Sequence, residues 1–214
     1  MISNDQIRTR ARAILGNNIF SGEWLYALLI VLVVSAINTA LSATGIGTLI
    51  ICGILASASA AYFTARVRNT TDYKNLGVTI DAVKADPVGH ILCGILHSIF
   101  IALWTMLFLI PGIIKGCSYA MTFYIRNDNP SMSANDAITE SRKLMDGYKM
   151  QYFLLQLSFI GWMILGMLCL GVGTLWVSAY ISTANAIFYE EVKAAKAAQF
   201  TTNNQDPFAE KKTF

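Results

Sequence analysis

Long apolar stretches alternate with short polar segments along most of this 214-residue chain. Six of the stretches have the composition of transmembrane helices, which predicts an all-α membrane protein. A helix of about 20 apolar residues crosses the hydrocarbon region of a bilayer. The fourth and sixth stretches are shorter, so they either span fully or enter only part way. The six stretches are residues 24–43, 47–67, 91–110, 112–125, 152–170 and 174–189.

The breaks within each successive pair of stretches are tight and uncharged. They fall at residues 44–47, at Pro111-Gly112 and at residues 171–173. Breaks of this kind leave no room for an external domain. We therefore expect the six helices to form three hairpins whose turns point outward.

The turns also indicate an internal repeat. The sequence Gly-Ile-Gly-Thr-Leu at 45–49 matches Gly-Val-Gly-Thr-Leu at 171–175, and Ile-Pro-Gly-Ile-Ile at 110–114 holds the middle place. One unit used three times would explain this spacing, although glycine-rich turns also resemble one another by chance. The predicted units, within one membrane domain of residues 1–198, are residues 4–68, 79–126 and 133–192.

Each predicted hairpin follows a polar, amphipathic stretch. In the first stretch Asn4 is the expected helix cap, and Arg8 and Arg12 lie away from the apolar stripe. The second stretch covers residues 79–85, and the third begins at Ser133. We expect these helices to lie in the cytoplasmic membrane interface, with the apolar side facing lipid and the bases facing phosphates. The apolar stripes comprise Ile7, Ala11, Ile14 and Leu15 in the first helix, and Ala137, Ile138, Leu144 and Met145 in the third.

The basic residues give the predicted hairpins an orientation. Fifteen of the sixteen Lys and Arg residues lie before, between or after the hairpins, and only Lys115 lies near an outward turn. By the positive-inside rule, both termini then face the cytoplasm. A composition of 55% hydrophobic and 14% charged residues excludes an ordinary soluble domain. Because the bases flank the spans, the net charge of +3 indicates contact with anionic lipid head groups and not with nucleic acid.

A set of short motifs spread over residues 7–192 resembles a family of bacterial integral membrane proteins called domain of unknown function 975. No single motif is diagnostic, but their order and spacing are specific. The motifs are Arg8–Arg12, Leu15–Asn17, Leu109–Lys115, Tyr119–Met121, Asn127–Pro130, Ser133–Ile138, Ser141–Met145, Phe159–Trp162 and Phe188–Glu191.

The resemblance implies a six-helix, multi-pass protein of the bacterial cytoplasmic membrane. It implies no activity, because the family is defined largely by sequence. The chain is also distantly similar to the membrane domains of some glycerophosphodiester phosphodiesterases. Their catalytic barrel has no counterpart in this sequence, so we do not expect their chemistry. Residues 199–214 lie outside the resemblance, and their polar composition predicts a disordered cytoplasmic tail.

Five polar residues within the predicted spans are candidates for ligand contacts or for the lining of a polar cavity. Lys115 can extend its side chain to the outer surface, or attract an anion there. His97 can pack or hydrogen-bond within the bundle, or relay protons. Asn38, Gln156 and Asn185 either hydrogen-bond between helices or line a cavity, because amides in a lipid environment need partners.

The chain offers little support for catalysis, a metal site or a cofactor. The four cysteines lie in apolar stretches and lack the spacing of a zinc site or a disulfide framework. His90, expected at the interface, is two helical turns from His97, too far for a usual metal pair. We expect the carboxylates at 190–191 to pair with bases, for example Arg142 or Lys143, and not to serve as catalytic acid and base.

The sequence favours one class of function over an alternative. The favoured class is a non-enzymatic membrane protein that associates with other membrane proteins, with itself or with lipid, and so organises the envelope. The alternative is a transporter or exporter of a small amphiphile or peptide, which the repeat and the break at Pro111-Gly112 favour. Transport would need an ionisable coupling residue within the membrane, for which His97 and Lys115 are the candidates. A membrane enzyme has the least support.

Overall fold

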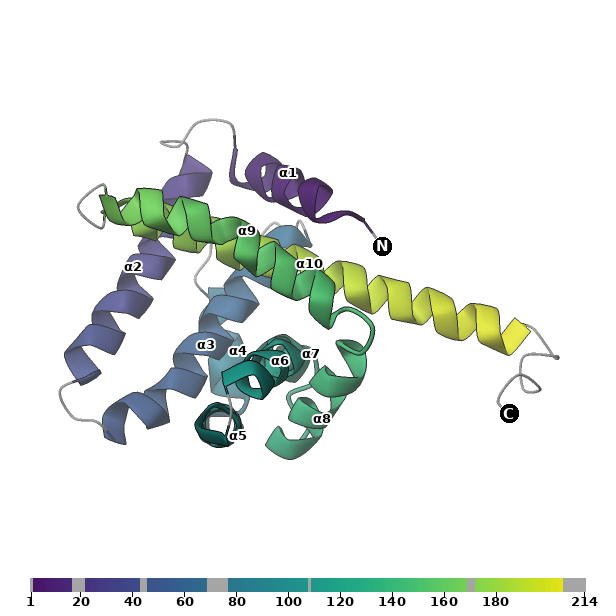
Figure 1. The fold of residues 1–214 in the computed structure, drawn as a ribbon. Helices are drawn as coiled ribbons and strands as arrows, with labels where there is room; N and C mark the ends of the chain where they lie inside the picture. The colour runs from purple at the N-terminus through teal and green to yellow at the C-terminus, as the bar shows by residue number, and fades with distance from the viewer. Residues whose placement is uncertain are drawn as a thin grey trace.

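The apolar and amphipathic segments fold into helices throughout the residues that the structure describes. The computed structural model describes residues 2–16, 22–42, 46–68, 77–107, 109–168 and 172–205. Within these ranges every regular element is a helix, which confirms the predicted all-α class (Figure 1). The ten helices found there are α1 (Asn4–Leu15), α2 (Gly22–Ser42), α3 (Ile46–Val67), α4 (Gly77–Ala85), α5 (Pro87–Leu107), α6 (Leu109–Tyr119), α7 (Thr122–Asp128), α8 (Ala134–Leu144), α9 (Lys149–Leu168) and α10 (Val172–Gln205).

Four of the predicted apolar helices form close to their predicted bounds. The first, second, third and fifth apolar stretches correspond to α2, α3, α5 and α9. Two of these, within the described residues, are long and apolar enough to cross a membrane. The windows are Gly22–Ala40 in α2, with a mean hydropathy of 1.8, and Lys149–Met167 in α9, with a mean hydropathy of 1.4. The six-span topology stays a prediction.

The fourth predicted stretch, residues 112–125, is divided into two helices. α6 ends and α7 begins around a break at Ala120 and Met121. The turn predicted at Pro111-Gly112 is wrong, because these two residues lie in the first turn of α6. Proline is tolerated there, since the first backbone N–H groups of a helix have no partner within it.

The sixth predicted stretch, residues 174–189, is part of a much longer helix. α10 continues to Gln205, so residues 199–205 are helical and the predicted disorder is wrong for them. Residues 206–214 of the predicted tail lie outside the described residues. The C-terminal part of α10 extends beyond the other helices (Figure 1).

α1 packs lengthwise against the rest of the protein, chiefly against α10 (Figure 1). Its cap is Ser3, one residue before the predicted Asn4, and Ser3 and Gln6 form a reciprocal capping box. Asn4 Nδ2 donates to Gln151 O and Gln151 Nε2 donates to Ile2 O, both at 3.0 Å, which ties this end of α1 to α9. The prediction that the apolar stripe faces lipid is therefore wrong. The residues of the stripe that are fully buried are Ile7, Ala11 and Leu15.

α8 also turns its apolar stripe towards the protein. Ser133 caps this helix, as the sequence predicts. Ala137 and Ile138 are buried, and α8 packs against α5 and α7. Ser141 Oγ donates to Ser118 O of α6 at 2.8 Å. α8 is thus a packed part of the bundle, which corrects the prediction that its stripe faces lipid.

The hydrophobic core surrounds α10, which passes through the middle of the molecule (Figure 1). Edge-to-face aromatic pairs join α10 to α9: Phe159 with Tyr180 at 5.1 Å between ring centroids, and Tyr152 with Phe188 at 5.2 Å. A short helix followed by a long one recurs as α1–α2, α4–α5 and α8–α9. This order follows the three predicted units, whose relationship by repetition stays a prediction.

Candidate functional site

The five residues proposed from the sequence lie on five different helices. Gln156 Nε2 of α9 donates to Asn185 Oδ1 of α10 at 2.7 Å, so these two amides bond each other between helices. His97 of α5 packs against the rings of Tyr119 and Phe123. Asn38 of α2 and Lys115 of α6 are half-buried. Among the described residues, Gln156 and Asn185 are thus the two candidates that the structure joins by a hydrogen bond.

A network of charges joins the ends of α3 and α7 to the middle of α10. The Asp128 carboxylate accepts from Arg68 Nη2 at 2.9 Å, from Tyr189 Oη at 2.8 Å and from Lys193 Nζ. Arg68 also pairs with Glu190 at 2.6 Å. Burial raises the pKa of Asp128, but its bonds to Arg68, Lys193 and Tyr189 outweigh burial, so the pKa lies below its ordinary value.

Glu190 and Glu191 are paired with bases, but with different bases from those expected. Glu191 pairs with Arg10 of α1 at 2.6 Å, and Glu190 pairs with Arg68. The suggested partners on α8 are therefore wrong, because α1 and the end of α3 lie closer to this part of α10. The pairs connect α10 to two helices that are far from it in sequence.

Two arginines near the ends of α3 and α7 are almost fully buried. Arg66 donates to Glu23 O at 2.7 Å, to the Glu23 carboxylate at 3.1 Å and to Ile14 O at 3.2 Å. Arg126 Nη2 donates to the Asp86 carboxylate. The two arginine side chains are 2% and 3% exposed, and charges so deeply buried require partners. The expectation that the bases contact lipid head groups is therefore wrong for Arg66 and Arg126.

Beside Arg126, a polar cluster joins α3, α5 and α7. Ser57 Oγ donates to Asn127 Oδ1 at 2.5 Å, and Asn127 Nδ2 donates to Ser57 O at 2.9 Å. Ser57 Oγ also lies 3.4 Å from His90 Nε2. His90 is 1% exposed, so the expectation that it lies at the interface is wrong. A side chain at Gly89 would meet the Arg126 guanidinium and the Asp86 carboxylate, so a larger residue there would force this ion pair to move.

A cavity of about 350 Å³, the tryptophan pocket, lies where α1, α2, α9 and α10 meet. Trp24 Nε1 donates to Gly16 O at 3.0 Å and so joins the end of α1 to the start of α2. Gly16 has a φ of 91°, a conformation that favours glycine and ends the helix. The walls of the pocket include Arg12, Gly16, Trp24, Trp162, Trp176 and Tyr180.

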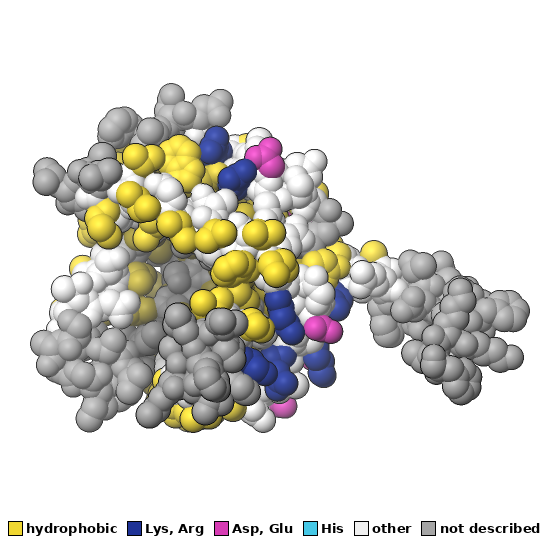
Figure 2. Space-filling view, in the orientation of Figure 1, with side chains coloured by type: hydrophobic (Ala, Val, Ile, Leu, Met, Phe, Trp, Pro, Cys, Tyr) yellow, Lys and Arg dark blue, Asp and Glu magenta, His cyan; other side chains and the backbone are white. Residues whose placement is uncertain are grey.

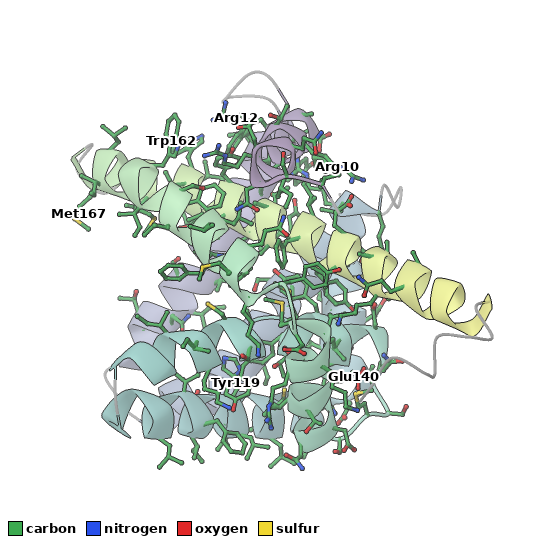
Figure 3. The ribbon with its side chains drawn as sticks, turned by 45° about the vertical axis from the view of Figure 1, so that its right-hand side comes forward. Arg10, Arg12, Tyr119, Glu140, Trp162 and Met167 are labelled. Atoms are coloured by element: carbon green, nitrogen blue, oxygen red, sulfur yellow. The ribbon has the colours of Figure 1, made fainter. Side chains whose placement is uncertain are left out.

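Arg12 supplies a positive charge to the tryptophan pocket. Its guanidinium carbon lies 5.7 Å from the Trp162 ring centroid and 5.6 Å from that of Tyr180. Both distances suit a cation–π contact. Figure 3 shows Arg12 of α1 and Trp162 of α9 on the same side of the molecule. A cation beside apolar walls can hold a molecule that has both an anionic group and an apolar part.

The sequence-based search missed the tryptophan pocket and the two buried arginines. Its five candidates are not among the residues that line the pocket. One signal was available: Trp24 and Trp176 stand near the ends of predicted spans, where tryptophan favours a membrane–water boundary. A second signal, for the buried arginines, was a carboxylate at the start of α2 and another at the start of α5. Glu23 precedes its partner Arg66 by 43 residues, and Asp86 precedes its partner Arg126 by 40.

The fold and these sites define an all-helical protein with two helices that could cross a membrane by length and composition. Residues 107–196 match the model of a family described as "Protein of unknown function (DUF975)". This match confirms the resemblance for the sequence motifs that lie within residues 107–196. No curated protein and no solved structure matches the chain.

Proposed function

We propose that the chain is a non-enzymatic, multi-pass protein of the bacterial cytoplasmic membrane that acts by associating with lipid or with other membrane proteins. The observation that carries this proposal is the exposure of two apolar helices. Only 17% of each candidate span in α2 and α9 is buried inside the protein. A core helix of a soluble protein buries most of its apolar residues, whereas a lipid-facing helix exposes them. Lipid is the environment in which such surfaces are stable.

Helix α5 also exposes apolar side chains, as α2 and α9 do. Figure 2 shows a band of hydrophobic side chains over α9, with basic side chains beside it over α1 and α8. A band of this kind flanked by bases suits a membrane with anionic head groups. The exposed apolar residues include Leu25, Leu29, Leu32 and Val33 of α2, Val88, Leu92, Ile99 and Leu103 of α5, and Leu154, Leu157, Ile160 and Ile164 of α9.

The charge network supports placing both termini on the cytoplasmic side. Arg68, Asp128 and Lys193 bring the ends of α3 and α7 together with α10. In the proposed topology these ends share one face of the membrane. The positive-inside rule assigns that face to the cytoplasm, because the bases of the chain are concentrated there.

The state of the carboxylates supports a non-enzymatic role. Asp86, Asp128 and Glu191 are each held in an ion pair with a base. A general acid or base works best with a pKa near the operating pH. The pKa of Asp128 is instead shifted below its ordinary value, away from neutrality. The three carboxylates thus hold helices together, and Asp128 is not poised for proton transfer.

Purification in a mild detergent tests the proposal. The chain is expected to leave the membrane only with detergent and to carry lipid, a membrane-protein partner or a second copy of itself. Mass spectrometry of the intact complex would identify the companion. A chain that purifies from the cytosol without detergent, free of lipid and partner, would contradict the proposed function.

A transporter of a small amphiphile is the second candidate, favoured by the break between α6 and α7. Discontinuous helices near the midplane are typical of transporter substrate sites. His97, on the neighbouring α5, packs against Tyr119 at the end of α6 and Phe123 of α7. Under this proposal His97→Gln would abolish substrate accumulation in proteoliposomes while leaving any partner association intact. Under the leading proposal it would change neither.

A further inference from the structure

We propose that the tryptophan pocket binds one anionic phospholipid, with Arg12 contacting the phosphate and the aromatic walls holding the glycerol and the start of the acyl chains. This inference rests on the proposed membrane location. It adds a defined ligand site, with a stated ligand chemistry, to a surface that otherwise contacts lipid without selectivity.

The shape of the pocket suits part of an amphiphile. Its volume of about 350 Å³ is near the lower end of the range of small-molecule sites, roughly 300–1,000 Å³. Trp24 and Tyr180 are buried in its walls, whereas Trp162 is 46% exposed at its edge. The pocket therefore has an apolar interior and an accessible rim. In the proposed complex the headgroup and the adjoining glycerol occupy the pocket, and the acyl chains extend out of it past the rim.

The charge of the pocket selects an anion. Arg8 pairs with Asp5 and Arg10 pairs with Glu191, whereas Arg12 has no carboxylate partner among the described residues. Arg12 is exposed, and its guanidinium lies over the rings of Trp162 and Tyr180. The Arg12 side chain also hydrogen-bonds to Tyr180, and the remaining N–H groups of the guanidinium can contact a phosphate.

The surroundings of the pocket favour a lipid over a soluble anion. Leu25 and Leu29 of α2 and Met163 and Met167 of α9 are exposed and apolar. They continue along the same two helices that carry Trp24 and Trp162. The pocket thus lies where the basic surface of α1 meets the exposed apolar surfaces of α2 and α9. Phosphates and acyl chains meet at the same kind of boundary in a bilayer.

Tryptophan fluorescence can test the assignment, because the pocket contains three of the four tryptophans of the chain. Trp104→Phe removes the fourth. This variant would be reconstituted into two vesicle preparations of identical composition, phosphatidylglycerol and phosphatidylcholine in equal parts. One preparation carries brominated acyl chains on phosphatidylglycerol and the other carries them on phosphatidylcholine. Since total charge and lipid are the same, any difference in quenching reports which lipid occupies the pocket.

Quenching is expected to be stronger when phosphatidylglycerol carries the bromine. Arg12→Gln should weaken the apparent affinity for phosphatidylglycerol about fivefold and make the two preparations quench equally. Arg8→Gln is the matched control. It removes the same charge from the same helix, but from a base already paired with Asp5, so it should keep the preference.

Three results would overturn the inference. Equal quenching of the parent chain by the two preparations would show lipid contact without a selective site. Equal losses in Arg12→Gln and Arg8→Gln would assign the preference to general surface charge. Loss of the preference on addition of inorganic phosphate would assign the pocket to a free anion. Absence of quenching by either lipid would instead contradict the membrane location, and with it the proposed function.

Discussion

Asp128 at the end of α7 joins two other helices through one carboxylate. It accepts hydrogen bonds from Arg68, the residue after α3, and from Tyr189 and Lys193 of α10. Its side chain is 12% exposed, so solvent screens these bonds only weakly. Two bases and a phenol therefore depend on this carboxylate, which makes it a sensitive point in the packing of the bundle.

Replacing Asp128 by Asn is expected to lower the free energy of unfolding by about 2 kcal/mol at neutral pH, because its charge-assisted hydrogen bonds are lost. Thermal unfolding in mild detergent, followed by circular dichroism, measures the change. The matched control is Asp146→Asn. Its carboxylate is 76% exposed and 3.4 Å from Lys149, so the change should be small. Equal destabilisation by the two variants would contradict the role of Asp128.

Measuring the stability of the parent chain and of Asp128→Asn at decreasing pH separates the effect of the Asp128 charge from that of packing. The pKa of Asp128 is lower in the folded chain than its ordinary value of 3.8, so the folded chain binds fewer protons than the unfolded chain. The stabilisation from Asp128 is therefore full above pH 3.8 and is lost as the pH falls through the lower, folded value. The difference between parent and Asp128→Asn should shrink in that range. A constant difference would show that the bonds do not depend on the charge.

Individual side chains were the part of the site least predictable from sequence. The pairing of Glu190 and Glu191 with bases could be predicted from their charge and position. Their partners could not, because Arg68 and Arg10 approach only once α1, α3 and α10 have packed. The pairing of Arg66 was likewise not predictable, because its partner Glu23 lies 43 residues earlier in the chain.

Helices α3 and α5 approach each other closely at Gly53. A side chain there would collide with the backbone oxygen of His90 and would lie 2.9 Å from Gly94 Cα. Backbone atoms cannot rotate away as flexible side chains can, so the two helices would have to separate. Small residues that let helix backbones approach are typical of membrane bundles.

Gly53→Ala is therefore expected to destabilise the bundle by about 3 kcal/mol, because overpacking forces the backbones apart. Gly161→Ala is the control, since a side chain at this helical position of α9 has nothing within 4 Å. It should raise stability by up to about 1 kcal/mol through the better helix propensity of alanine. Unfolding in mild detergent measures both variants. A neutral Gly53→Ala would contradict the close approach of α3 and α5.

Helix positions were more predictable than helix breaks. The apolar stretches that correspond to α2, α3, α5 and α9 can be recognised from their length and composition, which are local properties of the sequence. Pro111-Gly112 resembles the other predicted turns, yet Pro111 is compatible with the first turn of α6. The stripes of α1 and α8 were correctly placed on one face of each helix. Whether that face meets lipid or protein depends on tertiary packing, which periodicity alone does not specify.

At the scale of the whole molecule, two kinds of surface meet. The charge network and α1 lie against α10, while α2 and α9 leave most of their apolar residues exposed. The composition of the chain already predicted a membrane environment. The position of the tryptophan pocket was not predictable, because its walls come from four helices separated by up to about 160 residues of sequence.

The central claim is that the exposed apolar helices are embedded in a bilayer. Alkaline carbonate extraction of membranes from a bacterial host expressing the tagged chain tests it most directly, because high pH strips peripheral proteins but leaves embedded ones. The chain is expected to stay in the membrane pellet after the wash and to be released only by detergent. Recovery of the chain in the carbonate supernatant would contradict the account.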